Sequence, residues 1–319
     1  MLSSFPCPVC SNENWQVINT FHYSRSDRIP GSLGSWQEYV RLRRRVLFEV
    51  WCPNADRILL QSIFCRGCGF VTYSPRPSET DVDAKYRFLQ VEEKDIGGQD
   101  TSRKAQSFDR KRAGRVYRTV IRYTGCKRLE VLDFGGGNGK LLVPFSRRGH
   151  LCHLIDYTLQ PLPGINKVGD TLDDIPSGQK YQVILCSHVL EHVANPSRTV
   201  RELLAHLMPG GVIYGEVPLD IWGGIDISYD PVTHINFFNQ YSFEELFRRG
   251  GLRVLESKTL AATYGARRLD VVMIVAQKDG QGTAPRCLSG VNETRRLLNP
   301  TLLMRLYRLW RLRRLPTLR

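Results

Sequence analysis

Two pairs of cysteines are the residues whose spacing most directly indicates chemistry. The motif CPVC at residues 7–10 and the motif CRGC at residues 65–68 each place two thiols at C-x-x-C spacing. Four thiolates in this arrangement suit a tetrahedral Zn²⁺ ion in a closed structural site that leaves no position for water. Redox-active dithiols or unrelated free cysteines are the alternatives. The spacing therefore predicts structural Zn²⁺ at Cys7, Cys10, Cys65 and Cys68, with residues 15–60 inserted between the pairs as a hairpin or loop.

A second feature is the glycine-rich stretch VLDFGGGNGKLL at residues 131–142. It follows the pattern D-x-G-x-G-x-G, made by Asp133, Gly135, Gly137 and Gly139. A P-loop requires G-x-x-x-x-G-K-[ST], but here Lys140 comes too early and Leu141 stands in place of the hydroxyl. A dinucleotide-binding turn requires a third glycine at the position that Lys140 occupies. Because an acid beside an open glycine turn attracts a cation rather than a pyrophosphate, the stretch favours a cationic ligand. A glycine turn without a ligand is the alternative.

The elements that must position these residues follow from the hydrophobic pattern of residues 126–278. Short apolar runs alternate there with helical patterns, which is typical of a parallel α/β sheet with right-handed crossovers. Strands are expected at residues 130–134, 151–156, 181–187, 211–217, 252–258 and 269–277, with a weaker one at 165–168. Helices are expected at residues 79–89, 102–123, 139–148, 196–207 and 242–249. The last two strands leave no room for a helix between them, so we expect an antiparallel pair at the sheet edge.

The glycine stretch resembles the first motif of the class I S-adenosylmethionine (SAM)-dependent methyltransferases. Three later stretches resemble further motifs of that family: GDTLDDIP at residues 169–176, YQVILCSHVLEHVANP at 181–196 and LMPGGVIYGEVP at 207–218. The resemblance covers about half of the chain. It implies an α/β fold of Rossmann-like type, with a seven-stranded, mostly parallel sheet, helices on both faces and ligands at the carboxyl ends of the strands.

The same resemblance implies SAM as cofactor and assigns roles to particular residues. The glycines let the backbone approach the methionine part of SAM, and the site of Asp133 holds its ammonium group. Asp156, at the end of the next strand, takes both ribose hydroxyls, while Asp170 is positioned for the exocyclic amine of adenine. The cofactor-binding residues that the resemblance implies are Asp133, Gly135, Gly137, Gly139, Asp156, Tyr157, Asp170, Thr171 and Ser187.

An N-terminal four-cysteine module ahead of such a domain is similar to sugar C-methyltransferases and related enzymes of polysaccharide and antibiotic-sugar pathways. VTYSPRPSETDVDAKY at residues 71–86 also resembles the join between the two parts in that group. The resemblance implies a small zinc-ribbon-like module that helps to form the cleft for a sugar or glycan acceptor. We therefore expect a zinc-binding module at residues 1–75, a helical connector or cap at 76–125, a methyltransferase domain at 126–278, and a linker with a basic amphipathic tail at 279–319.

Histidines are the candidate catalytic residues, because an acceptor that must lose a proton needs a base. His234 follows the fifth strand, where the family often carries a base, although a structural hydrogen bond is its alternative role. His188 directly follows the fourth strand, near the expected sulfonium, whereas His192 is expected to pack or cap.

The residues around His234 bear on the type of methylation. Sugar C-methyltransferases carry Tyr-x-Glu-His at this position, but residues 231–234 here read Pro-Val-Thr-His. O-methylation of a sugar hydroxyl, on a nucleotide-sugar, glycan or lipid-linked glycan, is therefore the prediction. A sugar C-methyltransferase, an RNA methyltransferase and a non-catalytic SAM-binding module are the alternatives.

The net charge of +14 favours anionic partners. The pattern of residues 299–319, NPTLLMRLYRLWRLRRLPTLR, predicts an amphipathic helix suited to an anionic membrane surface. The alternatives are a helix docked on the body of the protein and a disordered basic end. Nucleic acid is not expected as a partner, because no recognised RNA-binding module accompanies the charge. With no run apolar enough for a signal peptide or a membrane span, we expect a cytoplasmic protein, peripheral at the inner face of the membrane if the tail binds lipid.

Overall fold

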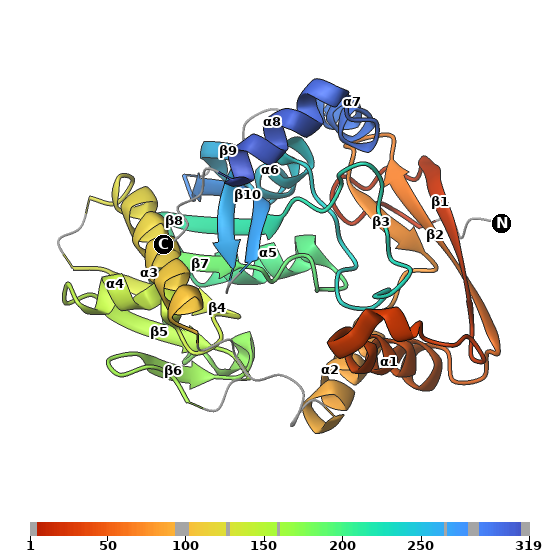
Figure 1. Cartoon of the computed structure of the whole chain (residues 1–319). Coiled ribbons are helices and arrows are strands. Elements are labelled where there is room, and N and C mark those ends of the chain that lie inside the picture. The colour runs from red at the N-terminus through yellow and green to blue at the C-terminus, as the bar shows by residue number, and fades with distance from the viewer. Residues whose placement is uncertain are drawn as a thin grey trace.

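The computed structural model of the chain describes residues 5–92, 102–125, 128–157, 160–264, 267–279 and 287–313. Its central element is a seven-stranded sheet in the order β6–β5–β4–β7–β8–β10–β9 (Figure 1). The strands are β4 (Glu130–Phe134), β5 (Leu151–Ile155), β6 (Asn166–Gly169), β7 (Tyr181–Ser187), β8 (Leu207–Pro218), β9 (Arg253–Tyr264) and β10 (Arg267–Gln277). The first five pair in parallel, and β10 pairs antiparallel with both β8 and β9. The order reverses between β4 and β7, which creates the switch point where α/β sheets bind ligands.

Helices cover both faces of this sheet, because alternate residues of each strand point to opposite sides. Val183 and Leu185 of β7 join the core beneath α3 (Arg103–Ile121) and α4 (Val143–Ser146), while Ile184 and Cys186 join the core beneath α5 (Pro196–Ala205) and α6 (Gln240–Arg249). Strands buried on both faces read as continuous apolar runs, which explains why the sequence indicated them so clearly. The predicted Rossmann-like sheet is confirmed.

A smaller antiparallel sheet, in the order β1–β2–β3, is built from the N-terminal part of the chain. Its strands are β1 (Trp15–Ser24), β2 (Arg57–Cys65) and β3 (Val71–Ser74). The segment between β1 and β2 contains a 3₁₀ helix (η1, Gly31–Trp36), α1 (Gln37–Arg45) and a π-helical turn (η2, Val46–Trp51). Helix α2 (Glu79–Glu92) follows β3. Val71 and Phe237 exchange backbone hydrogen bonds of 3.0 and 2.9 Å. Residues of this module and of the α5–α6 face belong to one continuous apolar core, so the two parts fold against each other.

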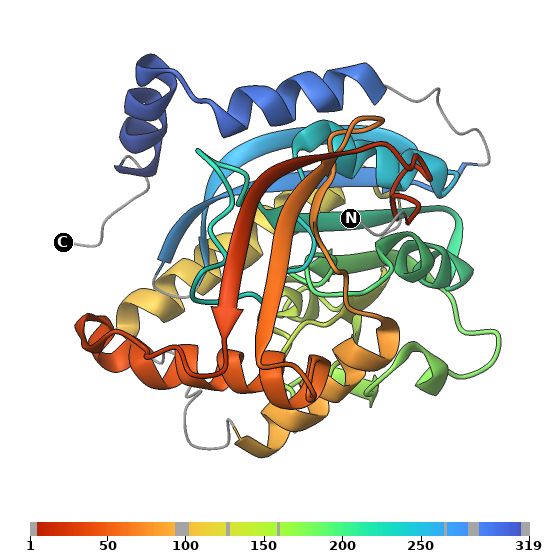
Figure 2. The ribbon, with the colours of Figure 1, turned by 90° about the vertical axis from the view of Figure 1, so that its right-hand side faces the viewer.

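Two helices close the described chain, α7 (Cys287–Leu298) and α8 (Leu302–Arg313). Figure 2 shows α7 lying across the top of the molecule and α8 turning away from it. α7 crosses the second cysteine motif at close range, since a Cβ on Gly69 would lie 2.1 Å from the carbonyl oxygen of Gly290. Across the described ranges, every helix is too short or too polar to cross a lipid bilayer.

Several expected elements differ from the structure. Residues 139–148 were expected to form one helix, but a 3₁₀ turn (η4, Lys140–Leu142) precedes the short α4, because Gly139 is left-handed at φ 85°. The strand expected at residues 211–217 begins earlier, at Leu207, so that Pro-Gly-Gly at residues 209–211 lies inside β8. α1 and α7 were not predicted. The tail helix is present as α8, whereas residues 280–286 of the expected linker and 314–319 of the expected tail lie outside the described residues.

Candidate functional site

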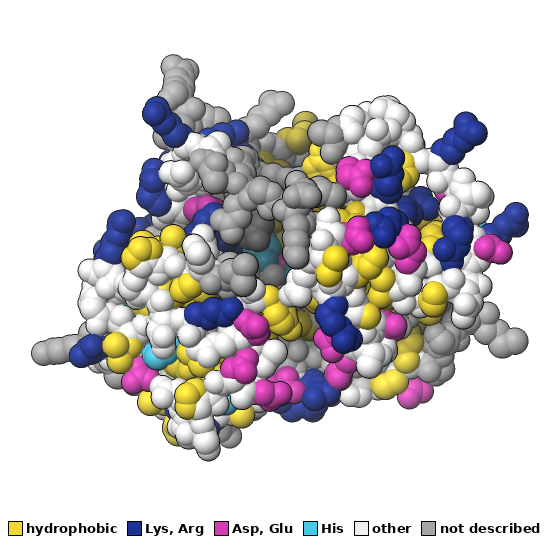
Figure 3. Space-filling view, turned by 90° about the horizontal axis from the view of Figure 1, so that it is seen from below, with side chains coloured by type: hydrophobic (Ala, Val, Ile, Leu, Met, Phe, Trp, Pro, Cys, Tyr) yellow, Lys and Arg dark blue, Asp and Glu magenta, His cyan; other side chains and the backbone are white. Residues whose placement is uncertain are grey.

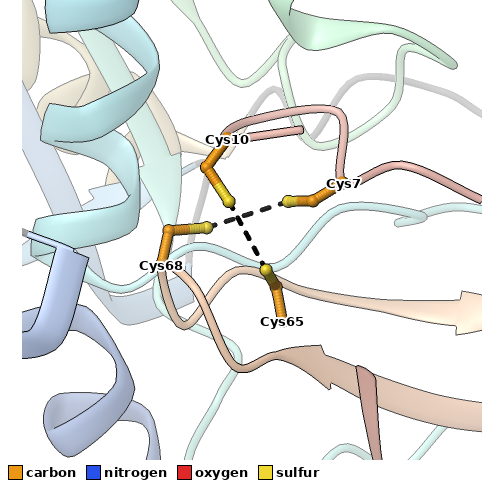
Figure 4. A group of neighbouring side chains, drawn as sticks. All are labelled: Cys7, Cys10, Cys65 and Cys68. Carbon is orange, nitrogen blue, oxygen red and sulfur yellow. Dashed lines mark hydrogen bonds between the residues drawn. The ribbon is translucent and has the colours of Figure 1, made fainter. Parts of the chain in front are cut away.

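The four cysteines of the two C-x-x-C motifs converge on one point (Figure 4). Cys7 Sγ lies 3.7 Å from Cys68 Sγ, and Cys10 Sγ lies 3.5 Å from Cys65 Sγ. A disulfide requires about 2.05 Å between sulfurs, whereas the edge of a tetrahedron with Zn–S bonds of about 2.3 Å is about 3.8 Å. All four sulfurs lie within 4.8 Å of one another and all four residues are buried. The spacing of this cysteine cluster fits a closed zinc site.

The surroundings of the cysteine cluster favour thiolates at some positions. The backbone N–H of Gly67 donates to Cys65 Sγ at 3.3 Å, and hydrogen bonds from the neighbouring thiols hold the pKa of Cys65 far below its ordinary value. Burial instead raises the pKa of the Cys7 thiol. A bound divalent cation deprotonates the thiols that coordinate it. Four buried thiols at this spacing are therefore suited to bind such a cation as thiolates.

The glycine stretch forms the turn after β4, at the switch point. Gly135, Gly137 and Gly139 all have positive φ, at 68°, 60° and 85°. A Cβ on Gly135 would lie 2.4 Å from Val189 Cγ2, so packing already requires glycine there, whereas a Cβ on Gly137 would meet nothing within 4 Å. Gly137 therefore has open space on the side where a ligand would approach the backbone.

Asp133 is the residue of this turn whose surroundings best fit a cationic ligand. It is fully buried, and neither carboxylate oxygen has a hydrogen-bond partner. Burial raises the pKa of Asp133 to about 7. A buried polar group without a partner costs about 1–3 kcal/mol, and a charged one costs more; an ammonium group would offset this cost. The donor set thus fits the amino end of SAM.

Asp156 and Tyr157 follow β5 at the same edge. Asp156 Oδ2 accepts the backbone N–H of Gly137 at 2.8 Å, which places this carboxylate directly beside the glycine turn. Tyr157 is half exposed and stacks on Tyr86 of α2, with ring centroids 6.4 Å apart. The turn after β5 therefore brings together a carboxylate suited to ribose hydroxyls and an aromatic surface that the N-terminal part of the chain completes.

Asp170 and Thr171 lie in the turn after β6 and are tied to their own neighbours. Asp170 forms an ion pair with Lys167 at 2.6 Å. Thr171 caps the 3₁₀ turn Leu172–Asp174, in which Asp174 Oδ2 accepts the backbone N–H groups of residues 170 and 171. The roles expected for Asp170 and Thr171 toward adenine stay predictions.

Ser187 ends β7 within a buried charged network that sequence reasoning missed. Arg112 of α3 donates to Ser187 Oγ at 2.6 Å and to Glu216 Oε1 at 2.9 Å, and Arg115 donates to Glu216 Oε2 at 2.5 Å. Burial opposes the charge of Glu216, yet Arg112 and its neighbours hold the pKa of Glu216 well below its usual range. The network fixes α3 against the carboxyl ends of β7 and β8. The helical pattern predicted α3, but no local signal indicated these partners.

His188 links this network to the acceptor side. It has φ 57°, an uncommon conformation for a residue other than glycine. Its Nδ1 lies 3.2 Å from Glu191 Oε1 and its Nε2 lies 3.7 Å from Glu216 Oε1. Burial opposes a charged ring, but the two carboxylates raise the pKa of His188 above its ordinary value.

His234 lies in the loop between β8 and α6, and Asp220 from the same loop holds its ring. His234 Nδ1 lies 2.8 Å from Asp220 Oδ2, and the rings of His192 and His234 have centroids 4.8 Å apart. Burial disfavours the charged form of His234, but the bond to Asp220 and the charge of Glu191 raise its pKa. The structure thus brings His188, Glu191, His192 and His234 together in one group. In Figure 3 a histidine side chain is visible within a hollow on the lower face.

The N-terminal module supports the loop that carries His234. Tyr39 of α1 donates to Asp230 Oδ2 at 2.6 Å, and Arg43 of the same helix donates to Thr233 Oγ1 at 3.1 Å. Lys85 of α2 donates to the carbonyl of Val232 at 3.2 Å. Sequence reasoning expected the module to help form the acceptor cleft but named none of these residues. These residues become evident only because the fold pairs segments that lie 147 to 191 residues apart in the sequence.

A family model described as a methyltransferase domain matches residues 105–257. A ubiquinone biosynthesis O-methyltransferase of Rickettsia canadensis is 29% identical over 108 residues, which are 30% of this chain and 46% of the relative. The corresponding protein of Rickettsia felis is 28% identical over 108 residues, or 44% of its length. The chain thus spans less than half the length of the curated relatives it matches.

Solved structures with similar architecture have low sequence identity. The 1,6-didemethyltoxoflavin-N1-methyltransferase of Burkholderia thailandensis, solved with S-adenosylhomocysteine, has a TM-score of 0.46 and 16% identity, over 66% of this chain and 96% of that one. The N-methyltransferase NodS of Bradyrhizobium japonicum has a TM-score of 0.43 and 14% identity, over 60% of this chain and 97% of that one. The family match, together with the sheet order, identifies residues 105–257 as a class I methyltransferase domain, of the SAM-dependent type.

Proposed function

We propose that this chain methylates an oxygen acceptor, a sugar hydroxyl on a nucleotide-sugar, glycan or lipid-linked glycan. SAM would supply an electrophilic methyl group on a sulfonium. Asp133 would hold the ammonium end, the turn at Gly137 would face the methionine part, and Asp156 would take the ribose hydroxyls. The relatives from Rickettsia are named O-methyltransferases, which supports oxygen as the acceptor atom.

The Asp220–His234 pair is the observation that carries this proposal. A carboxylate can only accept, so His234 Nδ1 must donate to Asp220 across their 2.8 Å contact. When the ring is neutral, it therefore keeps its lone pair on Nε2, the tautomer used by a histidine that serves a hydroxyl. That nitrogen can act on the acceptor hydroxyl directly as a base or through a bound ion. Carbon deprotonation needs a stronger base than this partly exposed pair provides.

Methyl transfer from isotope-labelled SAM to a panel of sugar and phenol acceptors tests the proposal. We expect label in an O-methyl group of a sugar acceptor, with transfer reduced in His234→Ala. A C-methyl product would support the sugar C-methyltransferase alternative, and label in RNA would support the RNA alternative. SAM binding without transfer to any acceptor would support a non-catalytic module. Label in a phenol alone would reject the sugar and retain O-methylation.

We propose that the cysteine cluster holds a structural Zn²⁺ ion. Its support is the tetrahedral spacing of four buried sulfurs. A closed four-thiolate site has no position for a substrate, so the ion would shape the module that positions Tyr39 and Arg43. Metal analysis of undenatured protein should find at least one zinc per chain, and a chain without zinc that is equally stable would reject the proposal.

We also propose that α8 contacts an anionic membrane surface. Six large apolar side chains of α8 are exposed, from 47% for Trp310 to 78% for Leu303: Leu302, Leu303, Leu306, Tyr307, Leu309 and Trp310. Arg308 anchors the helix to the buried Asp270 at 2.6 Å. Vesicles that contain phosphatidylserine should bind the protein more tightly than neutral vesicles do. Equal binding of a Leu303→Asp, Leu306→Asp double variant would reject membrane contact.

A further inference from the structure

A second group of potential metal ligands lies on the acceptor side, well apart from the cysteine cluster in sequence. Glu191, His192 and His234 each offer one ligand atom, and these atoms lie within 4.8 Å of one another. Glu191 Oε1 is 3.7 Å from His192 Nε2. Ligands that bind one ion at about 2.1 Å lie roughly 3.0–3.4 Å apart at neighbouring positions, so small side-chain rotations would bring the three donors to a common ion.

Hydrogen bonds fix the tautomer of both histidines. The carbonyl oxygen of Thr233 lies 2.7 Å from His192 Nδ1, and Asp220 Oδ2 lies 2.8 Å from His234 Nδ1. Both partners can only accept, so both Nδ1 atoms carry the proton. Each neutral ring therefore keeps its lone pair on Nε2. Metal-ligating histidines almost always donate their other ring N–H to a backbone carbonyl or a carboxylate in this way.

The buried carboxylate of Glu191 is an independent observation in favour of a metal ion. Its side chain is 1% exposed, yet neither carboxylate oxygen has a partner with hydrogen-bond geometry. The contact with His188 Nδ1 at 3.2 Å is an ion pair only if that ring is protonated. Buried carboxylates are normally paired or coordinate a metal. Lys85 donates to the Val232 carbonyl and forms no hydrogen bond with either oxygen of Glu191.

We propose that Glu191, His192 and His234 bind one divalent transition-metal ion. Two imidazoles and one carboxylate form the ligand set of open sites that bind iron, manganese, cobalt or zinc, whereas Mg²⁺ and Ca²⁺ prefer oxygen ligands alone. Three protein ligands leave coordination positions for other groups. If the proposed O-methylation holds, those positions take oxygen atoms of the acceptor. His234 is then a ligand that orients the acceptor rather than the base itself.

The experiment uses the full chain with zinc in its cysteine cluster, titrated with Mn²⁺ and followed by electron paramagnetic resonance. Mn²⁺ is a suitable probe because it favours nitrogen and oxygen over thiolates. We expect one Mn²⁺ per chain, with affinity reduced at least 100-fold in Glu191→Gln and in His234→Ala. His22→Ala, which removes an exposed histidine of β1, should leave binding unchanged. Equal binding by all variants, or none by the wild type, would overturn the proposal.

A second measurement needs no variant. Co²⁺ added to the zinc-loaded protein should give the weak visible bands of nitrogen and oxygen ligation without a strong sulfur charge-transfer band. A sulfur band would place the ion in the cysteine cluster and refute the site. Mn²⁺ binding without methyl transfer to any acceptor would support the metal site and reject the proposed function. Transfer by a wild-type chain that binds no Mn²⁺ would reject the metal site and retain the function.

Discussion

The donor side and the acceptor side of this site are built in different ways. The donor side consists of Asp133, the glycine turn and Asp156, which adjacent strands of one sheet bring together. The acceptor side takes Glu191 and His192 from the loop after β7, and Asp220 and His234 from the loop after β8; α1 and α2 brace the second loop. The donor side thus depends on local backbone geometry, whereas the acceptor side depends on how the N-terminal module docks.

Replacement of Cys65 by serine should have the largest effect and falls on the acceptor side. Metal binding contributes on the order of 10 kcal/mol to isolated zinc modules, so loss of one ligand should unfold much of the module. SAM binding by the methyltransferase domain should persist, as isothermal titration calorimetry would show, while methyl transfer stops. Cys52→Ser, in the same module but outside the cluster, is the control. Loss of SAM binding as well would break the distinction between the two sides.

The His234→Ala variant should reduce kcat by roughly 10²–10⁴-fold, because it removes either the base itself or one ligand of the ion that orients the acceptor. The dissociation constant for SAM should stay unchanged, because His234 belongs to the acceptor side alone. Steady-state kinetics together with calorimetry separates the two quantities. His22→Ala serves as the matched control. An equal loss of SAM affinity would show that the two sides are not independent.

The Asp133→Asn variant tests the donor side. A hydrogen bond to a charged group contributes about 1.5–3 kcal/mol, so SAM affinity should fall by roughly 10- to 100-fold. Asp170→Asn is the comparison, because Asp170 is exposed and already paired with Lys167; its effect should be smaller. If both variants bind SAM as the wild type does, the role assigned to Asp133 is wrong.

The pH dependence of SAM binding follows from the same carboxyl group. Its pKa is raised to about 7, so it is neutral below that pH and negatively charged above it. Only the charged form attracts an ammonium group, so affinity should fall by up to about tenfold per unit as pH drops from 7 toward 5.5. Calorimetry across this range should show the slope in the wild type and a flat profile in Asp133→Asn.

The Thr294→Val variant should have the smallest effect, about 1–2 kcal/mol of unfolding free energy. Thr294 of α7 is buried; it donates to the Gly69 carbonyl at 2.5 Å and accepts from Asn239 Nδ2 at 2.6 Å. Ser289→Ala, exposed on the same helix, should change stability by less than about 0.5 kcal/mol. Denaturant titration measures both. If Thr294→Val lowers the free energy of SAM binding by more than it lowers the free energy of unfolding, the donor side also depends on α7.

The sequence predicted the parts that depend on local pattern. The apolar runs of β4 and β7 and the glycines after β4 carry their own signal, because a buried parallel strand and a left-handed turn restrict residue type at each position. The cysteine spacing likewise fixed which thiols would meet. These residues form the donor side and the cysteine cluster.

The acceptor side could not be predicted in the same way. Glu191 lies in the turn after β7 and Asp220 in the loop after β8. His188 and His192 flank Glu191 in the sequence, but no local pattern links this stretch to Asp220 or His234. Their meeting with His192 and His234 follows from the parallel pairing of β7 and β8. The missed helix α7 is amphipathic, but what it covers, Gly69 and Asn239, is set by tertiary packing. Contacts between distant segments of this kind produce no repeating pattern in the sequence from which they could be predicted.

The close crossing of Gly69 and Gly290 has a consequence for the order of events during synthesis. The second cysteine motif emerges from the ribosome early, but the helix that covers its carbonyl oxygens is translated about 220 residues later. At a rate of about 5–20 residues per second, the motif waits at least about ten seconds for this cover. During that interval the Gly69 carbonyl is exposed to water and to chaperones. The hydrogen bond from Thr294 to the Gly69 carbonyl therefore cannot form until α7 has been made.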